Sequence, residues 1–342
     1  MIILFSKASL GRQVGMTLVE LMVSITISMI IMAGVIQLYF TASQTQRSQE
    51  GVARIQENMR YLFGKLEEDL TQTGHVGCVP FEGGVGESAL IKVLLLDKKS
   101  GLFDFEYFIN GADATGLRSS DTITLRYFSA SGQIPLEAPG MADVSSAFVL
   151  DDADPRYALL ERGDIALISD CSFADVFMIT NDPTASGGTI EHAIGVTVDG
   201  QSNISADFQK PYGLEAPNGS SAYLFGGSSA AIEWKLGTSA AGTAAGLNCA
   251  DDNKQYCALF RDGDEMAEGI EDLQVQYGWL DAADVLKLSD AGDVADWNAV
   301  QSVTVTLTIN SIQYAPTLDG SGLMSKQVSK TFMLRNQLPG AL

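Results

Sequence analysis

The chain has 342 residues, of which 42 are acidic, 21 are basic and 46% are hydrophobic, with a formal net charge of −21. This acidic excess disfavours a general binder of nucleic acid or of anionic membranes, because both need a basic surface. The apolar content excludes a wholly disordered chain. The length allows one large domain or two small ones.

The first predicted element is a long apolar helix near the N-terminus. Residues 21–46 form 26 consecutive uncharged positions. The most apolar stretch, residues 16–40, overlaps this run and would span roughly 37 Å as a helix, more than the roughly 30 Å hydrocarbon core of a bilayer. Lys7 and Arg12 precede this segment with no acidic residue nearby, which predicts a cytoplasmic N-terminus and an exported remainder. This apolar segment could be a cleaved secretory signal or a plain single-pass membrane anchor.

Glu20 indicates a third interpretation of this segment, because a carboxylate inside an apolar helix needs a partner or a functional reason. The surrounding string, GMTLVELMVS from Gly15 onward, resembles the type IV prepilin signal. That resemblance implies cleavage between Gly15 and Met16 by a prepilin peptidase and methylation of the Met16 amine. It also implies that Glu20 docks against the N-terminal amine of a neighbouring subunit. Loss of residues 1–15 would leave 19 basic against 42 acidic residues, a net charge of −23.

The helix is expected to continue beyond the membrane as an amphipathic segment over residues 41–73. No proline occurs between residues 16 and 79, so one helix of about 55 residues and roughly 80 Å is possible. Gly51 and Gly64 are the expected bends, and Gly74 the expected end. The apolar stripe of this second half consists of Val52, Ile55, Met59, Leu62, Leu66 and Leu70.

Short β-type segments follow, which together with the helix predict an α+β, pilin-like fold with a β-rich head over residues 74–342. Two long interruptions, residues 181–220 and the small-residue stretch 226–246, are interpreted as surface excursions or as linkers. A boundary between two lobes of the head is therefore placed near 181–246. The predicted strands are residues 89–96, 121–128, 164–169, 174–180, 270–278, 300–309 and 329–334.

Four cysteines lie in the predicted exported part, where oxidising conditions favour disulfides. The close spacing of one pair favours a small loop closed by that pair, which would leave the other two for a second bridge. A zinc site is the alternative, but the chain has no C-x-x-C and only two histidines, His75 and His192. The two predicted pairs are Cys249 with Cys257 and Cys78 with Cys171.

Three segments narrow the resemblance: residues 69–78, 163–180 and 268–278 are similar to the PilW family of type IV pilus minor pilins. The family implies a low-abundance structural subunit that helps to initiate pilus assembly at the tip. Its implied partners are the prepilin peptidase, other minor pilins, the major pilin, the inner-membrane assembly platform and a large tip adhesin. The implied location is the inner membrane, with a periplasmic head, and then the extracellular pilus.

Catalysis has little support in the sequence, so no enzyme, cofactor or metal is expected. The chain lacks the P-loop, H-E-x-x-H and G-x-S-x-G motifs. Acidic clusters at 151–154, 262–265 and 290–296 do not follow the calcium-loop pattern and are expected to be solvated. His75 is expected to be a cap or packing residue, and the three tryptophans to pack in the core or at its edge. A minor pseudopilin of a type II secretion system, and a membrane-tethered periplasmic enzyme or calcium-binding protein, are the alternative functions.

Overall fold

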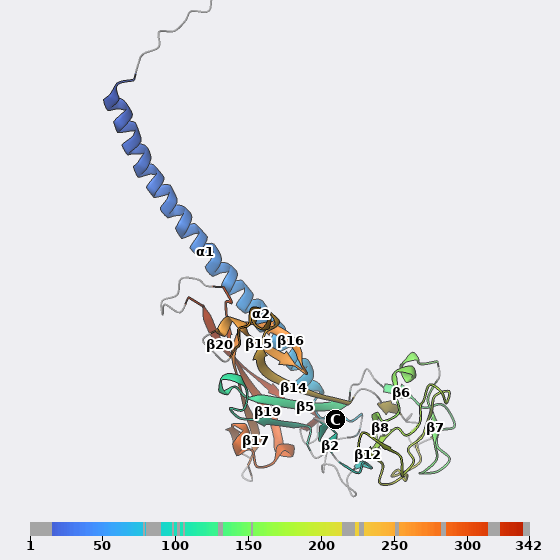
Figure 1. The fold of residues 1–342 in the computed structure, drawn as a ribbon. Coiled ribbons are helices and arrows are strands. Elements are labelled where there is room, and N and C mark those ends of the chain that lie inside the picture. Colours follow the sequence, from blue (N-terminus) through green and yellow to red (C-terminus); the bar gives the residue numbers. More distant parts are fainter. Residues whose placement is uncertain are drawn as a thin grey trace, which may run out of the picture.

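A 55-residue helix, α1 (Leu18–Gln72), dominates the computed structural model, and its first half stands free of the β-rich head (Figure 1). The helix is continuous through both glycines that the sequence suggested as bends. The fold is thus the expected α+β, pilin-like arrangement. The structure describes residues 16–77, 79, 90–97, 99–100, 103–104, 107–128, 133–151, 153–213, 223–225, 229–249, 253–281, 285–313 and 322–337.

The second half of α1 packs on the head through the predicted apolar stripe, with one exception. Val52 is 44% exposed, because α1 first meets the head at Gly51 and Val52 points away from it. The helix ends at the predicted place, since Gly74 adopts a left-handed conformation with φ of 75°. The buried residues of α1 are Gly51, Ile55, Leu62, Phe63, Leu66, Asp69 and Leu70.

Two antiparallel sheets form the part of the head that holds α1. The five-stranded sheet has the order β16-β15-β14-β5-β4, and the four-stranded sheet has the order β18-β17-β19-β20. Their inner faces and α1 share one hydrophobic cluster, which includes the fully buried Trp234 and Tyr277. The strands of the first sheet are β4 (Ile109–Ala112), β5 (Thr122–Phe128), β14 (Ser229–Thr238), β15 (Cys257–Arg261) and β16 (Asp264–Glu268). Those of the second are β17 (Ile270–Leu280), β18 (Leu286–Ser289), β19 (Val300–Asn310) and β20 (Ser325–Met333).

Strand β19 shows how the sequence pattern produces this packing. Val303, Val305 and Leu307 alternate with threonines, so every second side chain enters the core. The intervening hydroxyls lie on the outer face, where Thr304 and Thr306 form 2.8 Å hydrogen bonds with hydroxyls of β20. One face of the sheet is therefore apolar and covered, and the other is polar.

A third sheet, which we call the side sheet, lies away from α1 (Figure 1). Its strand order is β1-β9-β8-β13-β6, and only the β1–β9 pair is parallel. Its strands are β1 (Ile91–Val93), β6 (Gln133–Pro135), β8 (Ile165–Ser169), β9 (Ala174–Met178) and β13 (Tyr223–Phe225). Short pairs are formed by β2 (Lys99–Ser100) with β3 (Phe103–Asp104), β7 (Phe148–Val149) with β10 (Thr189–Ile190), and β11 (Thr197–Val198) with β12 (Gln201–Ser202).

The small-residue interruption differs from the sequence interpretation, and the earlier one packs on the head in part. Within residues 226–246, β14 is the central strand of its sheet, pairing with β5 and β15, and the short helix α2 (Ala240–Ala245) follows. Ile232, Trp234 and Leu236 alternate along this strand, but the small residues around them resemble a linker in composition. In the structure these small residues allow the strand to lie close to its neighbours. Within 181–213, Phe208 and Tyr212 are buried in the core of the side sheet, so this segment packs rather than projecting as a linker.

Candidate assembly helix and its attachment to the head

The first half of α1 presents an uninterrupted apolar surface. In the part of the chain that the structure describes, α1 is the one helix long and apolar enough to cross a membrane, and the apolar window is not buried by the head. From Met16 to Phe40 the large apolar side chains are all exposed. In water such a surface would be unfavourable. It therefore belongs in a bilayer or against other apolar helices.

Glu20 lies in the first turn of this apolar helix. Thr17 is the N-cap, and its hydroxyl accepts a 3.3 Å hydrogen bond from the backbone N–H of Glu20. A carboxylate in this turn interacts favourably with the positive end of the helix dipole. Among the residues that the structure describes, Glu20 has no ion-pair partner, and it remains exposed. Gly15 and the rest of residues 1–15 lie outside the described residues, so the cleavage and methylation sites stay predictions.

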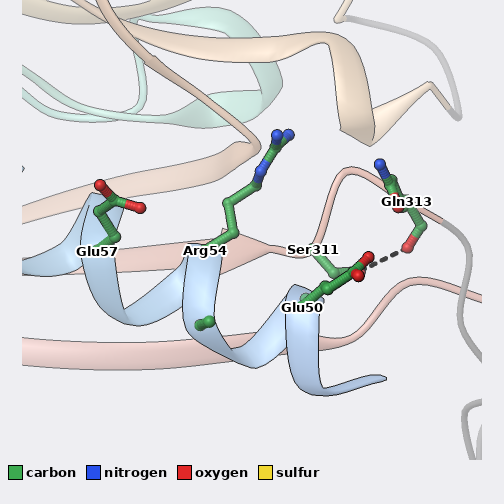
Figure 2. A pocket seen from close by; sticks show the side chains of 7 residues that line it. Glu50, Arg54, Glu57, Ser311 and Gln313 are labelled. Atoms are coloured by element: carbon green, nitrogen blue, oxygen red, sulfur yellow. Dashed lines mark hydrogen bonds between the residues drawn. The ribbon is translucent and has the colours of Figure 1, made fainter. Parts of the chain in front are cut away.

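A shallow pocket of about 340 Å³ lies where α1 meets the head. Figure 2 shows Glu50, Arg54 and Glu57 on the helix, facing the segment with Ser311 and Gln313. The Ser311 hydroxyl donates to the carbonyl oxygen of Gln313 at 2.8 Å. The charged groups of the pocket lining are the carboxylates of Glu50 and Glu57 and the guanidinium of Arg54.

A buried polar cluster near the end of α1 attaches the helix to the head. The Asp69 carboxylate accepts two hydrogen bonds of 2.8 Å from the Arg261 guanidinium on β15. It also accepts a bond of 2.9 Å from the Trp234 indole and one of 3.2 Å from the Tyr127 hydroxyl. Asp69 is thus held by β5, β14 and β15 together. We call these four residues the Asp69 cluster.

The electrostatics of the Asp69 cluster favour the ion pair. The hydrogen bonds that Arg261 donates to Asp69 raise the pKa of the Arg261 guanidinium further above its ordinary value. Burial, and then the charge of Asp69, raise the pKa of the Tyr127 hydroxyl, which keeps it protonated as a donor. The carboxylate is therefore satisfied by three donor groups inside a largely apolar core.

The C-terminal end of α1 has a second attachment. The Asn336 side-chain amide donates to the carbonyl oxygens of Thr71, Gln72 and Thr73 at 3.2, 3.4 and 3.0 Å. These carbonyls have no partner within the helix, so the Asn336 amide caps this end of α1. A residue near the end of the chain thus fixes the helix end 263 to 265 positions earlier.

The predicted cysteines divide between described and undescribed residues. A disulfide joins Cys249 and Cys257, and Cys171 is also disulfide-bonded. Cys78 lies outside the described residues, so its pairing with Cys171 stays a prediction.

His75, Trp234 and Trp297 each contact other residues of the head. The His75 ring lies 2.7 Å from the carbonyl oxygen of Phe128, just beyond the end of α1. Trp234 is in the core, and Trp297 packs edge to face on Tyr277. Within the described ranges, no group of three or more histidine, cysteine or acidic side chains could hold a metal ion.

Sequence reasoning missed the Asp69 cluster. Asp69 follows Leu62 by seven positions and Leu66 by three, so it lies on the apolar stripe rather than on a solvated face. An acidic residue on the buried stripe of a helix was therefore the signal that could have identified it. The sequence held no comparable signal for its partner Arg261.

Comparison with known proteins supports the assignment of the N-terminal segment. Residues 11–36 match the prokaryotic N-terminal methylation motif. No curated protein and no solved structure matches the chain. The motif, the free apolar helix and the β-rich head support a type IV pilin-like or pseudopilin-like protein, and the motif is typical of structural subunits. They also fit anchoring in the inner membrane, processing by a prepilin peptidase, and assembly with other pilins in a membrane machinery.

Proposed function

We propose that the protein is a minor pilin that helps to initiate assembly of a type IV pilus with other minor pilins, at the pilus tip. The observation that carries this proposal is α1 itself: its motif-bearing half is free, while its other half is fixed in a large head. A free apolar helix can leave the bilayer only for a similarly apolar environment, which a bundle of pilin helices provides. The PilW-like segments 69–78, 163–180 and 268–278 support the minor-pilin assignment over a major subunit.

In this proposal Met16 becomes the methylated N-terminus, and Glu20 meets the N-terminal amine of a neighbouring subunit. A charge pair in an apolar helix bundle is little screened, so it would select the register of the incoming subunit. The head stays on the periplasmic side and then outside the cell. Its partners are other minor pilins, the major pilin, the assembly platform and a large tip adhesin.

The test is a strain that lacks the native gene and is complemented with variants. We expect the deletion to abolish surface pili and twitching and the wild-type gene to restore them. Glu20→Ala should fail to restore them. Glu50→Ala, an exposed acidic position on the same helix, is the matched control and should restore them.

Two outcomes would overturn the proposal. Loss of protein secretion with pili intact would instead indicate a pseudopilin of a type II secretion system. An intact mass that retains residues 1–15 would exclude both pilin functions and favour a membrane-tethered periplasmic protein. Normal piliation by Glu20→Ala would refute the docking role of this carboxylate alone.

A further inference from the structure

Residues 204–213, which we call the strap, cross the side sheet beside β9. The backbone N–H of Phe208 donates to the carbonyl oxygen of Val144 at 2.9 Å. The Gln209 side chain donates to the carbonyl oxygens of Leu90 and Ala174 at 3.3 and 3.1 Å. The strap therefore links the start of β9 to the segment before β1 and to the loop before β7.

Beneath the strap lies an aromatic cluster. The Phe208 ring stacks on the His192 ring with centroids 4.1 Å apart, and lies 5.0 Å from the Phe177 ring. All three residues are almost completely buried. Opening of the strap would therefore remove Phe208 from its partners and expose apolar surface on the side sheet.

Asp175 of β9 binds the strap through two hydrogen bonds. Its side chain is fully buried, and Oδ2 accepts hydrogen bonds from the Tyr212 hydroxyl at 2.6 Å and the Gln209 backbone N–H at 3.0 Å. Oδ1 is also buried and has no hydrogen-bond partner among the described residues. An ionised carboxylate with one oxygen unsatisfied in an apolar core is costly, whereas the neutral acid is much less so.

The surrounding charges do not remove this cost. Lys92 on β1 is aligned with Asp175, but its ammonium donates to the carbonyl oxygen of Asp207 at 3.1 Å. On the other side, β8 places the apolar Ile168 opposite Asp175. Burial raises the pKa of Asp175 to about 6, despite opposing effects of Tyr212, Gln209 and Lys92. The titratable and charged groups of the elements packed around Asp175 are Lys92 of β1, Asp170 after β8, and Asp207, Lys210 and Tyr212 of the strap, with Lys210 ion-paired to Asp170.

We propose that Asp175 is a proton-operated latch, which holds the strap closed over the aromatic cluster when the carboxyl is protonated and loosens the strap when it is ionised. The closed strap keeps the carboxyl dry, and the open strap lets water solvate it. The closed state therefore binds the proton more tightly than the open state. Closure is favoured most below the ordinary pKa of an aspartate, weakens as the pH rises from about 4 to about 6, and is constant above that.

Hydrogen exchange of the full chain in detergent, read by mass spectrometry on peptides covering residues 203–213, tests the latch. Wild type and Asp175→Asn are compared at each pH from 4 to 8. Both proteins contain His192, whose pKa is lowered by burial, so the effects of intrinsic exchange and of His192 protonation cancel in the ratio. The ratio of strap-opening constants, wild type over variant, should rise by up to about tenfold per pH unit between pH 4 and 6. It should then level off. A ratio that is the same at every pH would overturn the proposal.

Two further measurements test the latch without relying on Asp175→Asn alone. In wild type alone, protection of the strap should fall relative to that of β19 over the same pH range, which needs no folded variant. Tyr212→Phe removes one bond to Asp175 but leaves the carboxyl, so it should open the strap more often while keeping the pH dependence. Loss of the pH dependence in Tyr212→Phe as well as in Asp175→Asn would assign it to the strap contact rather than the carboxyl and overturn the latch.

Discussion

Asp69 and Arg261 lie 192 positions apart in the sequence and form a two-point ion pair, with both N···O distances at 2.8 Å. Asp69 is on the buried side of α1, and Arg261 is at the end of β15. Because two parallel hydrogen bonds fix both distance and orientation, the pair sets the rotation of the helix relative to the head. In a subunit that assembles through its helix, this rotation determines where the head lies on the assembly.

Asp69→Asn should therefore destabilise the head by about 2–3 kcal/mol, because it leaves the half-buried Arg261 guanidinium without its counter-charge. The loss is smaller than for a fully buried pair, since the Arg261 side chain is 29% exposed. Thermal unfolding of the full chain in detergent measures it. Glu67→Gln on the same helix is the matched control, because it breaks only an exposed ion pair with Lys330 of β20 and should cost about 0–1 kcal/mol. Equal effects of the two substitutions would contradict a special role for Asp69.

The helix and seven of the twenty strands of the described residues were predictable because their signals are local. The absence of proline and the stripe from Ile55 to Leu70 indicate α1, and the alternation of valine and threonine indicates β19. The Asp69–Arg261 pair was not predictable, since it depends on how β5, β14 and β15 bring distant residues together. Strand β14 was missed for another reason: its flanking glycine, serine and alanine residues resemble a linker in composition, and only tertiary packing makes them a central strand.

The two glycines of the second half of α1 allow a paired test on one helix. At Gly64 an added Cβ would meet nothing within 4 Å, so Gly64→Ala should stabilise the protein by about 1 kcal/mol through helix propensity. At Gly51 the same Cβ would lie 2.7 Å from Met324 Cε and 3.0 Å from Ser311 Cβ. Gly51→Ala should therefore lose that gain and be neutral or destabilising by about 1 kcal/mol. Melting temperatures of the two variants, measured side by side, decide this, and equal stabilisation by both would show that the head does not press on α1 at Gly51.

Gly111 and Tyr277 predict a specific rescue. A Cβ at Gly111 would lie 1.9 Å from the Tyr277 hydroxyl oxygen and 2.8 Å from the carbonyl oxygen of Thr122, so Gly111→Ala should cost about 1–3 kcal/mol. The Tyr277 hydroxyl is buried and has no hydrogen-bond partner in the described part of the chain, so Tyr277→Phe alone should be nearly neutral. The double variant should recover part of the loss, because the closest clashing atom is gone. Strictly additive effects of the two substitutions in denaturant unfolding would refute this contact.

His192 predicts a pH dependence opposite in sign to that of Asp175. Burial lowers the pKa of His192 below its ordinary value, and its Nδ1 is buried without a partner among the described residues. The unfolded chain therefore binds the proton more readily than the folded one, and the contribution of His192 to stability is complete above about pH 6.5 and is lost as the pH falls. The slope cannot exceed about 1.4 kcal/mol per pH unit for one proton. His192→Phe keeps an aromatic ring on Phe208 but cannot titrate, so its stability should decline less than that of wild type between pH 6.5 and 4.5. Unfolding curves with the same pH dependence in both proteins would show that protonation of this imidazole does not limit the stability of the side sheet.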